Sequence, residues 1–271
     1  MLASAASNQC GAGFGAMAFP VIGPVGVIAV RQIVTALVLV PMVRPRIHVV
    51  TARQWWPIVG LALVFSVMNS ALYAAIERIG LGAAVTLEFL GPLAVAIGTS
   101  RRKIDLGAAS FAGIGVVMLT HPGLRSDLLG VGLALVAAMA WASYILLNRA
   151  VGQCIPGLQG TALASLVTAA AWAPVGIFWF SAHRPTGAAL LCAVGCGLLS
   201  SVVPYVADLL ALRRVPAHVF GTFASANPVL AALAGGVLLG QLLSVGEWVG
   251  IGLIVTSNVV VTAGSQPTGR P

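Results

Sequence analysis

Three charged residues stand inside long apolar stretches, and they are the side chains of this sequence with the clearest capacity for chemistry. Glu88 lies in "VTLEFLGPLAV", Arg31 in "VIAVRQIV" and Asp208 in "YVADLLAL". A charge in an apolar environment is costly unless it is paired or faces a polar cavity. A guanidinium binds a carboxylate through two parallel hydrogen bonds, and a carboxylate can hold an ammonium group or a proton. Residues of these types could therefore bind a zwitterion.

The patterns that usually carry catalysis or bind metals are missing from the sequence. It contains neither a phosphate-binding G-x-x-x-x-G-K-[ST] loop nor a zinc-binding H-E-x-x-H segment. Its histidines all lie in or near the loops between apolar stretches: His48, His121, His183 and His218. Its cysteines read as small buried hydrophobic residues: Cys10, Cys154, Cys192 and Cys196. We therefore expect neither an enzyme nor an ATP-driven pump, and neither a cofactor nor a metal. Two alternatives to this expectation stay open: a membrane-embedded enzyme and a non-transporting membrane scaffold.

The elements that position these charges are membrane-spanning helices. The chain is 59% hydrophobic and 7% charged, whereas soluble domains carry about 25% charged residues. Its charges separate apolar stretches of about 17–25 residues, the length of a transmembrane helix. The stretch 128–147 shows no alternation of apolar and polar residues, which excludes a β-barrel. The sequence predicts an all-α protein in a lipid bilayer, with ten spans near 2–18, 24–43, 55–76, 81–99, 105–120, 128–148, 159–180, 188–211, 217–240 and 246–264.

The positive charges predict the orientation of these spans. One set of connections and the tail hold ten basic residues: Arg44, Arg46, Arg53, Arg101, Arg102, Lys103, Arg149, Arg213, Arg214 and Arg270. The opposite set holds three: Arg78, Arg125 and Arg184. Because basic residues gather in cytoplasmic loops, both termini are expected in the cytoplasm. The net charge of +8 is thereby explained without nucleic acid as a partner.

An internal repeat divides the chain into two halves. At a constant offset of 136 residues, Ala75, Arg78, Thr86 and Pro92 recur as Ala211, Arg214, Thr222 and Pro228. The sequence thus predicts one five-helix unit over 1–122, a second over 127–265 and a short cytoplasmic tail over 266–271. An odd number of helices in each unit inverts the second unit relative to the first, as in secondary transporters that alternate access to a central site.

Three longer stretches add a resemblance to a known family. They are "VTLEFLGPLAVAIGTSRRKID", "SSVVPYVADLLALRRVPAHVFGTF" and "SNQCGAGFGAMAFPVIGPVGVIAVRQ". They resemble the threonine/homoserine exporter branch of the EamA-type drug/metabolite transporters. The resemblance implies ten helices in two inverted five-helix repeats, and export of small amino acids or related metabolites across a bacterial plasma membrane. Efflux of drugs, purines or another metabolite on the same scaffold is the alternative, and protons as the coupling ion and a homodimer are left open.

The sequence departs from that family at two acidic positions. Asn227 and Gln241 stand where the family tends to carry glutamates, which puts any coupling through those carboxylates in question. Glu88 remains, and Asp208 stands where the family often has Glu.

The candidate site residues follow from depth in the membrane. Glu88 and Arg31 each lie about seven residues, or roughly 10 Å, into a predicted span entered from outside, so we expect them to pair or to face one polar cavity. A structural ion pair and a receptor for substrate or proton stay equally open. Asp208 is interpreted either as a charge at the membrane interface or as a group that couples transport to an ion. Hydrogen-bonding and aromatic candidates for the cavity wall are Gln9, Asn69, Tyr73, Trp141, Tyr144, Tyr205 and Asn227. Pro92 and Pro228 are expected to kink their helices.

Overall fold

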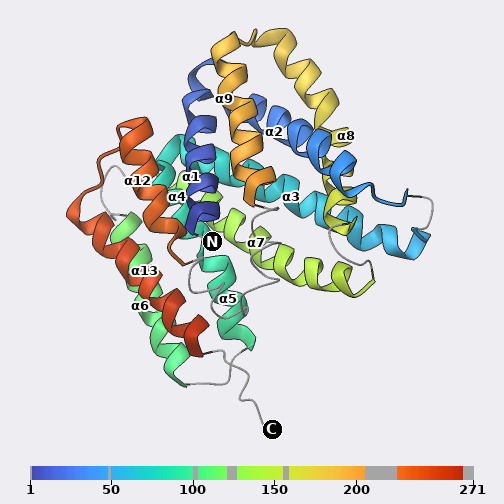
Figure 1. Ribbon diagram of the computed structural model, residues 1–271. Helices are drawn as coiled ribbons and strands as arrows, with labels where there is room; N and C mark the ends of the chain where they lie inside the picture. Colours follow the sequence, from blue (N-terminus) through green and yellow to red (C-terminus); the bar gives the residue numbers. More distant parts are fainter. Residues whose placement is uncertain are drawn as a thin grey trace.

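The regular secondary structure of the described residues is helical throughout. The computed structural model describes residues 2–47, 50–99, 103–120, 127–154, 159–204 and 225–264, and the regular structure in these ranges is helical (Figure 1). The first half forms α1 (Leu2–Met17), α2 (Phe19–Val43), α3 (Ala52–Ile79), α4 (Leu81–Glu88), α5 (Leu90–Thr99) and α6 (Lys103–Thr120). The second half forms α7 (Leu128–Cys154), α8 (Gln159–Ala182), α9 (Gly187–Gly197), the π-helical η2 (Leu198–Val202), α12 (Asn227–Leu239) and α13 (Val245–Gly264). The predicted all-α class is confirmed.

Most of these helices are long and apolar enough to cross a membrane. Six described stretches qualify by length and hydropathy: α2, α3, the joined α4 and α5, most of α7, α8 and most of α13. Shorter apolar helices run over 107–119, 187–202 and 227–239. With α1, these elements follow the order of the ten predicted spans. The adjoining parts of the eighth and ninth spans lie in 205–224, outside the described residues.

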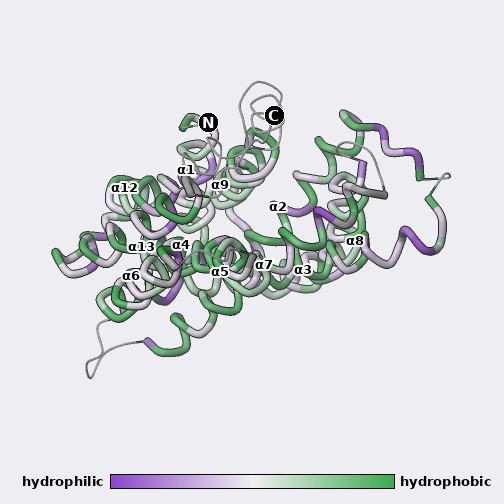
Figure 2. Tube along the Cα trace, turned by 90° about the horizontal axis from the view of Figure 1, so that it is seen from below, coloured by the Kyte–Doolittle hydropathy of each residue, from purple (hydrophilic) through white to green (hydrophobic). Residues whose placement is uncertain are grey.

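The outer surface of the helices is apolar. Large hydrophobic side chains stand exposed along it, among them Trp56, Phe178 and Val237. Figure 2 shows hydrophobic residues over most of the helical trace, while a hydrophilic stretch connects α2 to α3. A surface of this kind matches the hydrocarbon core of a bilayer rather than water. The protein is therefore an integral membrane protein.

Two helices are broken within the membrane region. In α2, Gly23 has φ 65° and ψ 172°, a conformation that favours glycine, and Pro24 follows it. The predicted span 81–99 is divided at Phe89, between α4 and α5. Pro92 lies three residues after that break and has no N–H to donate to the Glu88 carbonyl, so the helical ladder is interrupted there.

The helices pack in pairs that relate the two halves of the chain. Helix α2 lies along α8, α6 along α13, and α4 against α12. Helix α3 packs on α7, and the corresponding helix of the second half, α9, packs on α1. In the same way, α4 packs on α7, and its counterpart α12 packs on α1. Exchange of the first and second five-helix sets leaves this pattern unchanged, as a pseudo-two-fold axis requires. The predicted boundary between the sets falls within 121–126, outside the described residues.

Small residues allow the closest of these contacts. A Cβ added to Gly115 on α6 would lie 2.8 Å from the Gly250 carbonyl oxygen on α13. A Cβ added to Gly91 on α5 would overlap the Ala138 carbonyl of α7. Without a side chain at these points, the backbones can approach each other directly, as is common between helices in membranes.

Candidate functional site

The guanidinium of Arg31 lies at the centre of a polar cluster inside the helix bundle. Its Nη1 donates to the Asn69 Oδ1 at 2.6 Å and to the Tyr73 hydroxyl at 3.2 Å. Its Nε donates to the Ser201 Oγ at 3.1 Å, and its Nη2 donates to the Ser200 carbonyl at 3.3 Å. The guanidinium carbon also lies 5.4 Å from the centre of the Tyr73 ring, within cation–π distance. These acceptors fix the plane of the Arg31 guanidinium group.

Helix α3 supplies one wall of the cluster. Asn69 and Tyr73 are four residues apart, so they project from the same face of the helix. The Asn69 Nδ2 donates to the Phe65 carbonyl at 2.7 Å, which turns its Oδ1 toward Arg31. Tyr73 is fully buried, and its hydroxyl lies 2.9 Å from the Cys196 Sγ on α9. Arg31 is thus held against α3, and Tyr73 joins α3 to α9.

The π-helical segment η2 supplies the opposite wall. The backbone N–H of Val203 reaches the Leu198 carbonyl, five residues back, as a π-helix requires. The neighbouring carbonyls then accept side-chain donors: Ser200 from Arg31, and Leu199 from the Ser7 Oγ at 2.9 Å. The Ser200 Oγ donates to the Asn8 carbonyl at 2.7 Å. The irregular segment therefore ties α1 and α2 to the second half of the chain.

A second polar contact between the halves lies near the middle of α1. The Gln9 Nε2 donates to the Asn227 Oδ1 at 2.8 Å, joining α1 to the first residue of α12. Gln9 is buried. Gln241, the other amide expected at an acidic position of the family, accepts the Leu81 N–H at 2.9 Å and so anchors the start of α4. Both amides, Asn227 and Gln241, make hydrogen bonds within the protein.

Glu88 is buried at the end of α4, and a direct ion pair with Arg31 is one of the two arrangements expected from its depth. Glu88 is 6% exposed. Among the described residues no ion pair joins its carboxylate to Arg31, whose donors reach oxygens of α3 and η2. The charge of Arg31 nevertheless acts electrostatically on the carboxyl. Of the two expected arrangements, a direct pair and a shared polar cavity, the described residues do not show the direct pair, because equal depth does not fix which face of each helix a residue occupies; the shared cavity stays a prediction.

The structure distributes the other candidates around this cluster. Trp141 on α7 packs edge-on against Phe89, next to Glu88, with ring centres 4.6 Å apart. Tyr144, one turn further along α7, packs on Phe65 at 5.1 Å. Pro228 stands in the first turn of α12, where a proline needs no backbone partner; because residues 205–224 lie outside the described residues, the expected kink stays a prediction. The remaining two candidates, Tyr205 and Asp208, lie outside the described residues.

The sequence did not predict the residues that the second half of the chain contributes to the Arg31 cluster. Ser200 and Ser201 appear in the sequence only as two small polar residues in an apolar run, and Cys196 reads as a hydrophobic residue. Two adjacent hydroxyls within a predicted span were the available signal. Their role depends on the π-helical register, which hydropathy does not reveal.

Outside the membrane region, the start of α7 carries an ion pair. The Asp127 carboxylate lies 2.7 Å from the Arg78 Nη1. Its other oxygen accepts the Gly130 N–H at 3.0 Å, capping the helix. The Gly130 hydrogen bond and the Arg78 guanidinium hold the pKa of Asp127 below its usual range.

Comparison with known proteins shows the family of this chain. Residues 128–263 match the EamA-like transporter family. The chain is also 33% identical over 268 residues to the threonine/homoserine exporter RhtA of Escherichia coli (strain K12), covering 96% of this chain and 88% of that relative. The chain belongs to the EamA-like transporter family. As an EamA-family protein it is a membrane transporter rather than an enzyme, and the predicted resemblance is confirmed.

Further relatives agree with this placement. The threonine/homoserine exporter RhtA of Salmonella typhimurium (strain LT2) is 34% identical over 253 residues, 90% of this chain and 83% of the relative. The uncharacterized transporter YwfM of Bacillus subtilis (strain 168) is 26% identical over 244 residues, 84% of this chain and 80% of the relative. A solved crystal structure of another protein superposes with a TM-score of 0.64 at 19% identity, covering 96% of both chains. The EamA-family fold therefore extends along nearly the whole chain.

Proposed function

We propose that this EamA-family transporter exports small amino acids of the threonine or homoserine kind from the bacterial cytoplasm, by alternating access between two inverted halves. The names of the RhtA relatives support the substrate class. The observation that carries the proposal is the oriented Arg31 guanidinium inside the bundle. An intramembrane charge of this kind typically marks a substrate or ion pathway.

Arg31 has the chemistry to receive the carboxylate of an amino acid. A guanidinium fork binds a carboxylate in a bidentate manner, and Asn69, Tyr73 and Ser201 hold this fork in a fixed plane. Glu88 is the buried carboxylate that we assign to the ammonium group of the substrate or to a coupling proton. Together the two charges match a zwitterion, whose opposite ends need opposite partners.

The export direction is supported by the names of the RhtA relatives, and the positive residues favour an orientation with both termini in the cytoplasm and the protein in the plasma membrane. Gln9 with Asn227 and Ser7 with Leu199 are contacts between the halves, and Leu199 directly precedes Ser200 of the Arg31 cluster. Rocking of one half against the other would break these contacts and expose the cluster to the opposite side.

Transport into inside-out vesicles tests the proposal. Labelled threonine, homoserine and serine are offered to vesicles that contain the wild-type protein, with and without a proton gradient. We expect saturable uptake, and Arg31→Lys should raise the half-saturating concentration at least tenfold, because hydrogen bonds to charged groups are worth about 1.5–3 kcal/mol.

Arg184→Lys is the matched control, because it makes the same substitution in an exposed connection between α8 and α9. It should leave the uptake unchanged. Absence of uptake for every amino acid of a broad panel would contradict the proposal, as would an Arg31→Lys variant with wild-type kinetics.

A further inference from the structure

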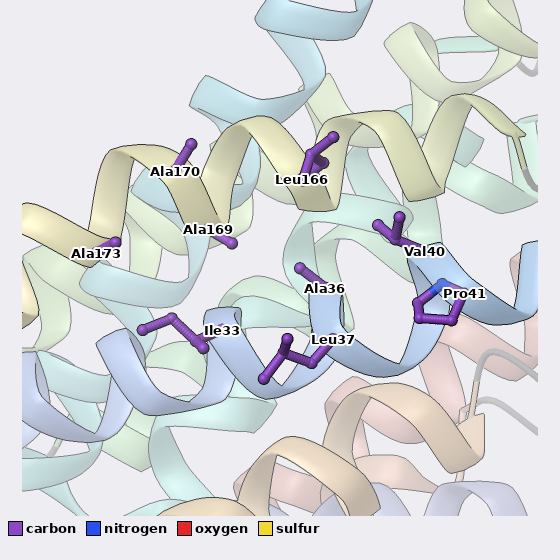
Figure 3. A pocket seen from close by; sticks show the side chains of 9 residues that line it. All are labelled: Ile33, Ala36, Leu37, Val40, Pro41, Leu166, Ala169, Ala170 and Ala173. Carbon is purple, nitrogen blue, oxygen red and sulfur yellow. The ribbon is translucent and has the colours of Figure 1, made fainter. Parts of the chain in front are cut away.

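An apolar groove runs along the outside of the bundle between α2 and α8. It has a volume of about 400 Å³ (Figure 3). Five of its lining residues come from α2 and four from α8: Ile33, Ala36, Leu37, Val40, Pro41, Leu166, Ala169, Ala170 and Ala173. All of these side chains are hydrocarbon. Leu37 and Ala170 are exposed, so the groove opens to the surroundings of the protein.

The groove arises because the two helices separate after a close crossing. A Cβ added to Gly176 on α8 would lie 3.1 Å from the Ala29 Cβ on α2, so the backbones nearly touch there. Beyond that crossing, the small side chains of Ala36, Ala169 and Ala173 leave the space unfilled, as Figure 3 shows. From Ile33 to Pro41 the groove extends about 12 Å along the helix axis. That length corresponds to one leaflet of a hydrocarbon core about 30 Å thick.

Four exposed arginines gather at the end of the molecule toward which the groove runs. Arg44 and Arg46 follow directly on α2, Arg53 opens α3, and Arg149 lies near the end of α7. The end of α7 and the start of α8 pack together at Val151 and Gly160. In Figure 1 the ends of α2 and α7 and the starts of α3 and α8 lie on the same side of the bundle.

The charge of this end is not offset by neighbouring carboxylates in the sequence. No Asp or Glu occurs between Arg44 and Glu77, or between residues 128 and 207. Arg44 also adopts a left-handed conformation with φ 49°, and its N–H donates to the Val40 carbonyl at 2.8 Å. A residue with a side chain is costly in that conformation, where glycine is usual. Here it places a cation directly beyond the groove.

We propose that the α2–α8 groove and the arginines Arg44 and Arg46 form a binding site for an anionic phospholipid. One acyl chain lies in the groove, and the phosphate and acidic headgroup lie against the two guanidinium groups. Basic residues at the cytoplasmic surface attract anionic lipids, and the hydrocarbon lining offers no partner to a polar ligand. The site is separate from the Arg31 cluster, so the proposal does not depend on the substrate of the transporter.

Native mass spectrometry of the full chain in detergent tests the site. The protein is titrated with phosphatidylglycerol and, separately, with phosphatidylcholine of identical acyl chains. We expect phosphatidylglycerol to bind more tightly. The double variant Arg44→Gln/Arg46→Gln should lose about fivefold in phosphatidylglycerol affinity for each arginine removed, whereas Arg44→Lys/Arg46→Lys should keep most of it. Equal affinity of the wild type for the two lipids would overturn the proposal.

A matched pair of substitutions tests the groove itself. Ala170→Phe fills it, whereas Ala171→Phe adds the same ring to the next residue, which is exposed but does not line the groove. We expect only Ala170→Phe to lose both lipids. Equal binding by the two variants would contradict a site in the groove, and a change from dimer to monomer in Ala170→Phe would show that a second copy of the chain occupies it. The arginine variants are on the exposed surface and decide the question even if Ala170→Phe does not fold.

Discussion

Arg31 is the residue at which the two halves of the transporter meet. Its acceptors on α3, Asn69 and Tyr73, belong to the first half, and its acceptors on η2, Ser200 and Ser201, belong to the second. A substrate carboxylate that binds the guanidinium would compete with some of these oxygens. Because a ligand shifts an equilibrium only by its differential affinity for two states, this exchange of partners gives substrate binding a direct effect on the relative position of the halves.

Glu88 provides a test of proton coupling at a single side chain. We expect Glu88→Gln to abolish uptake driven by a proton gradient in inside-out vesicles, because the amide cannot carry a proton, while exchange of labelled for unlabelled substrate continues. The exchange assay serves as the control for folding and binding. Gradient-driven uptake with the pH dependence of the wild type would exclude Glu88 as the proton carrier.

Asp127 provides a pH test outside the membrane. Its pKa is lowered in the folded protein by the Gly130 N–H and by Arg78, so the stabilisation is present above the unfolded value of about 3.9 and is lost as the pH falls through the folded value. We expect Asp127→Asn to unfold at a lower temperature than the wild type at pH 7. The difference between the two proteins should shrink below pH 4, as followed by thermal unfolding in detergent. A constant difference across this range would show that the carboxylate charge is not responsible.

At the scale of elements, the junction of α9 and η2 sets the position of the Arg31 cluster. A Cβ added to Gly197 would lie 2.9 Å from the Val34 Cβ and 3.3 Å from the Arg31 Cα. Gly197→Ala should therefore push the second half away from α2, at a cost of about 1–3 kcal/mol in the free energy of unfolding, and reduce transport without changing a polar residue.

Gly195→Ala is the control for this substitution, two residues earlier on the same helix. A Cβ added to Gly195 meets no atom within 4 Å. Substrate uptake and thermal unfolding of the two variants are compared side by side. Equal behaviour would show that the close contact at Gly197 has no influence on the site.

The sequence was informative about elements and less so about their interior geometry. Apolar run lengths predicted the helices, since the membrane leaves few alternatives for a backbone. They did not predict the π-helical turn at 198–202 or the start of α2 at Phe19, which depends on a break at Gly23 inside a continuous apolar stretch. They also did not predict which face of its helix Arg31 or Glu88 occupies, because helix rotation is set by packing.

At the scale of the whole molecule, α2 and α8 show how the halves are related. Each is the second helix of its five-helix set. The Trp179 Nε1 donates to the Ile22 carbonyl at 2.7 Å, and Gly176 packs against Ala29, so the end of α8 meets the start of α2. Equivalent helices thus run antiparallel and lie in direct contact. This is the arrangement that an inverted repeat produces at its pseudo-two-fold axis.

Reporter fusions at equivalent points of the two halves test this inversion in the cell. Residue 46 follows α2 and residue 184 follows α8, so the two points correspond in the repeat. We expect a green fluorescent protein fused after residue 46 to fluoresce in the cytoplasm, and alkaline phosphatase fused after residue 184 to be active outside it. Inverted halves place equivalent points on opposite sides of the membrane, whereas parallel halves place them on the same side. The reciprocal fusions are the controls, and one reporter active at both positions would exclude the inverted topology and, with it, alternating access by rocking of the two halves.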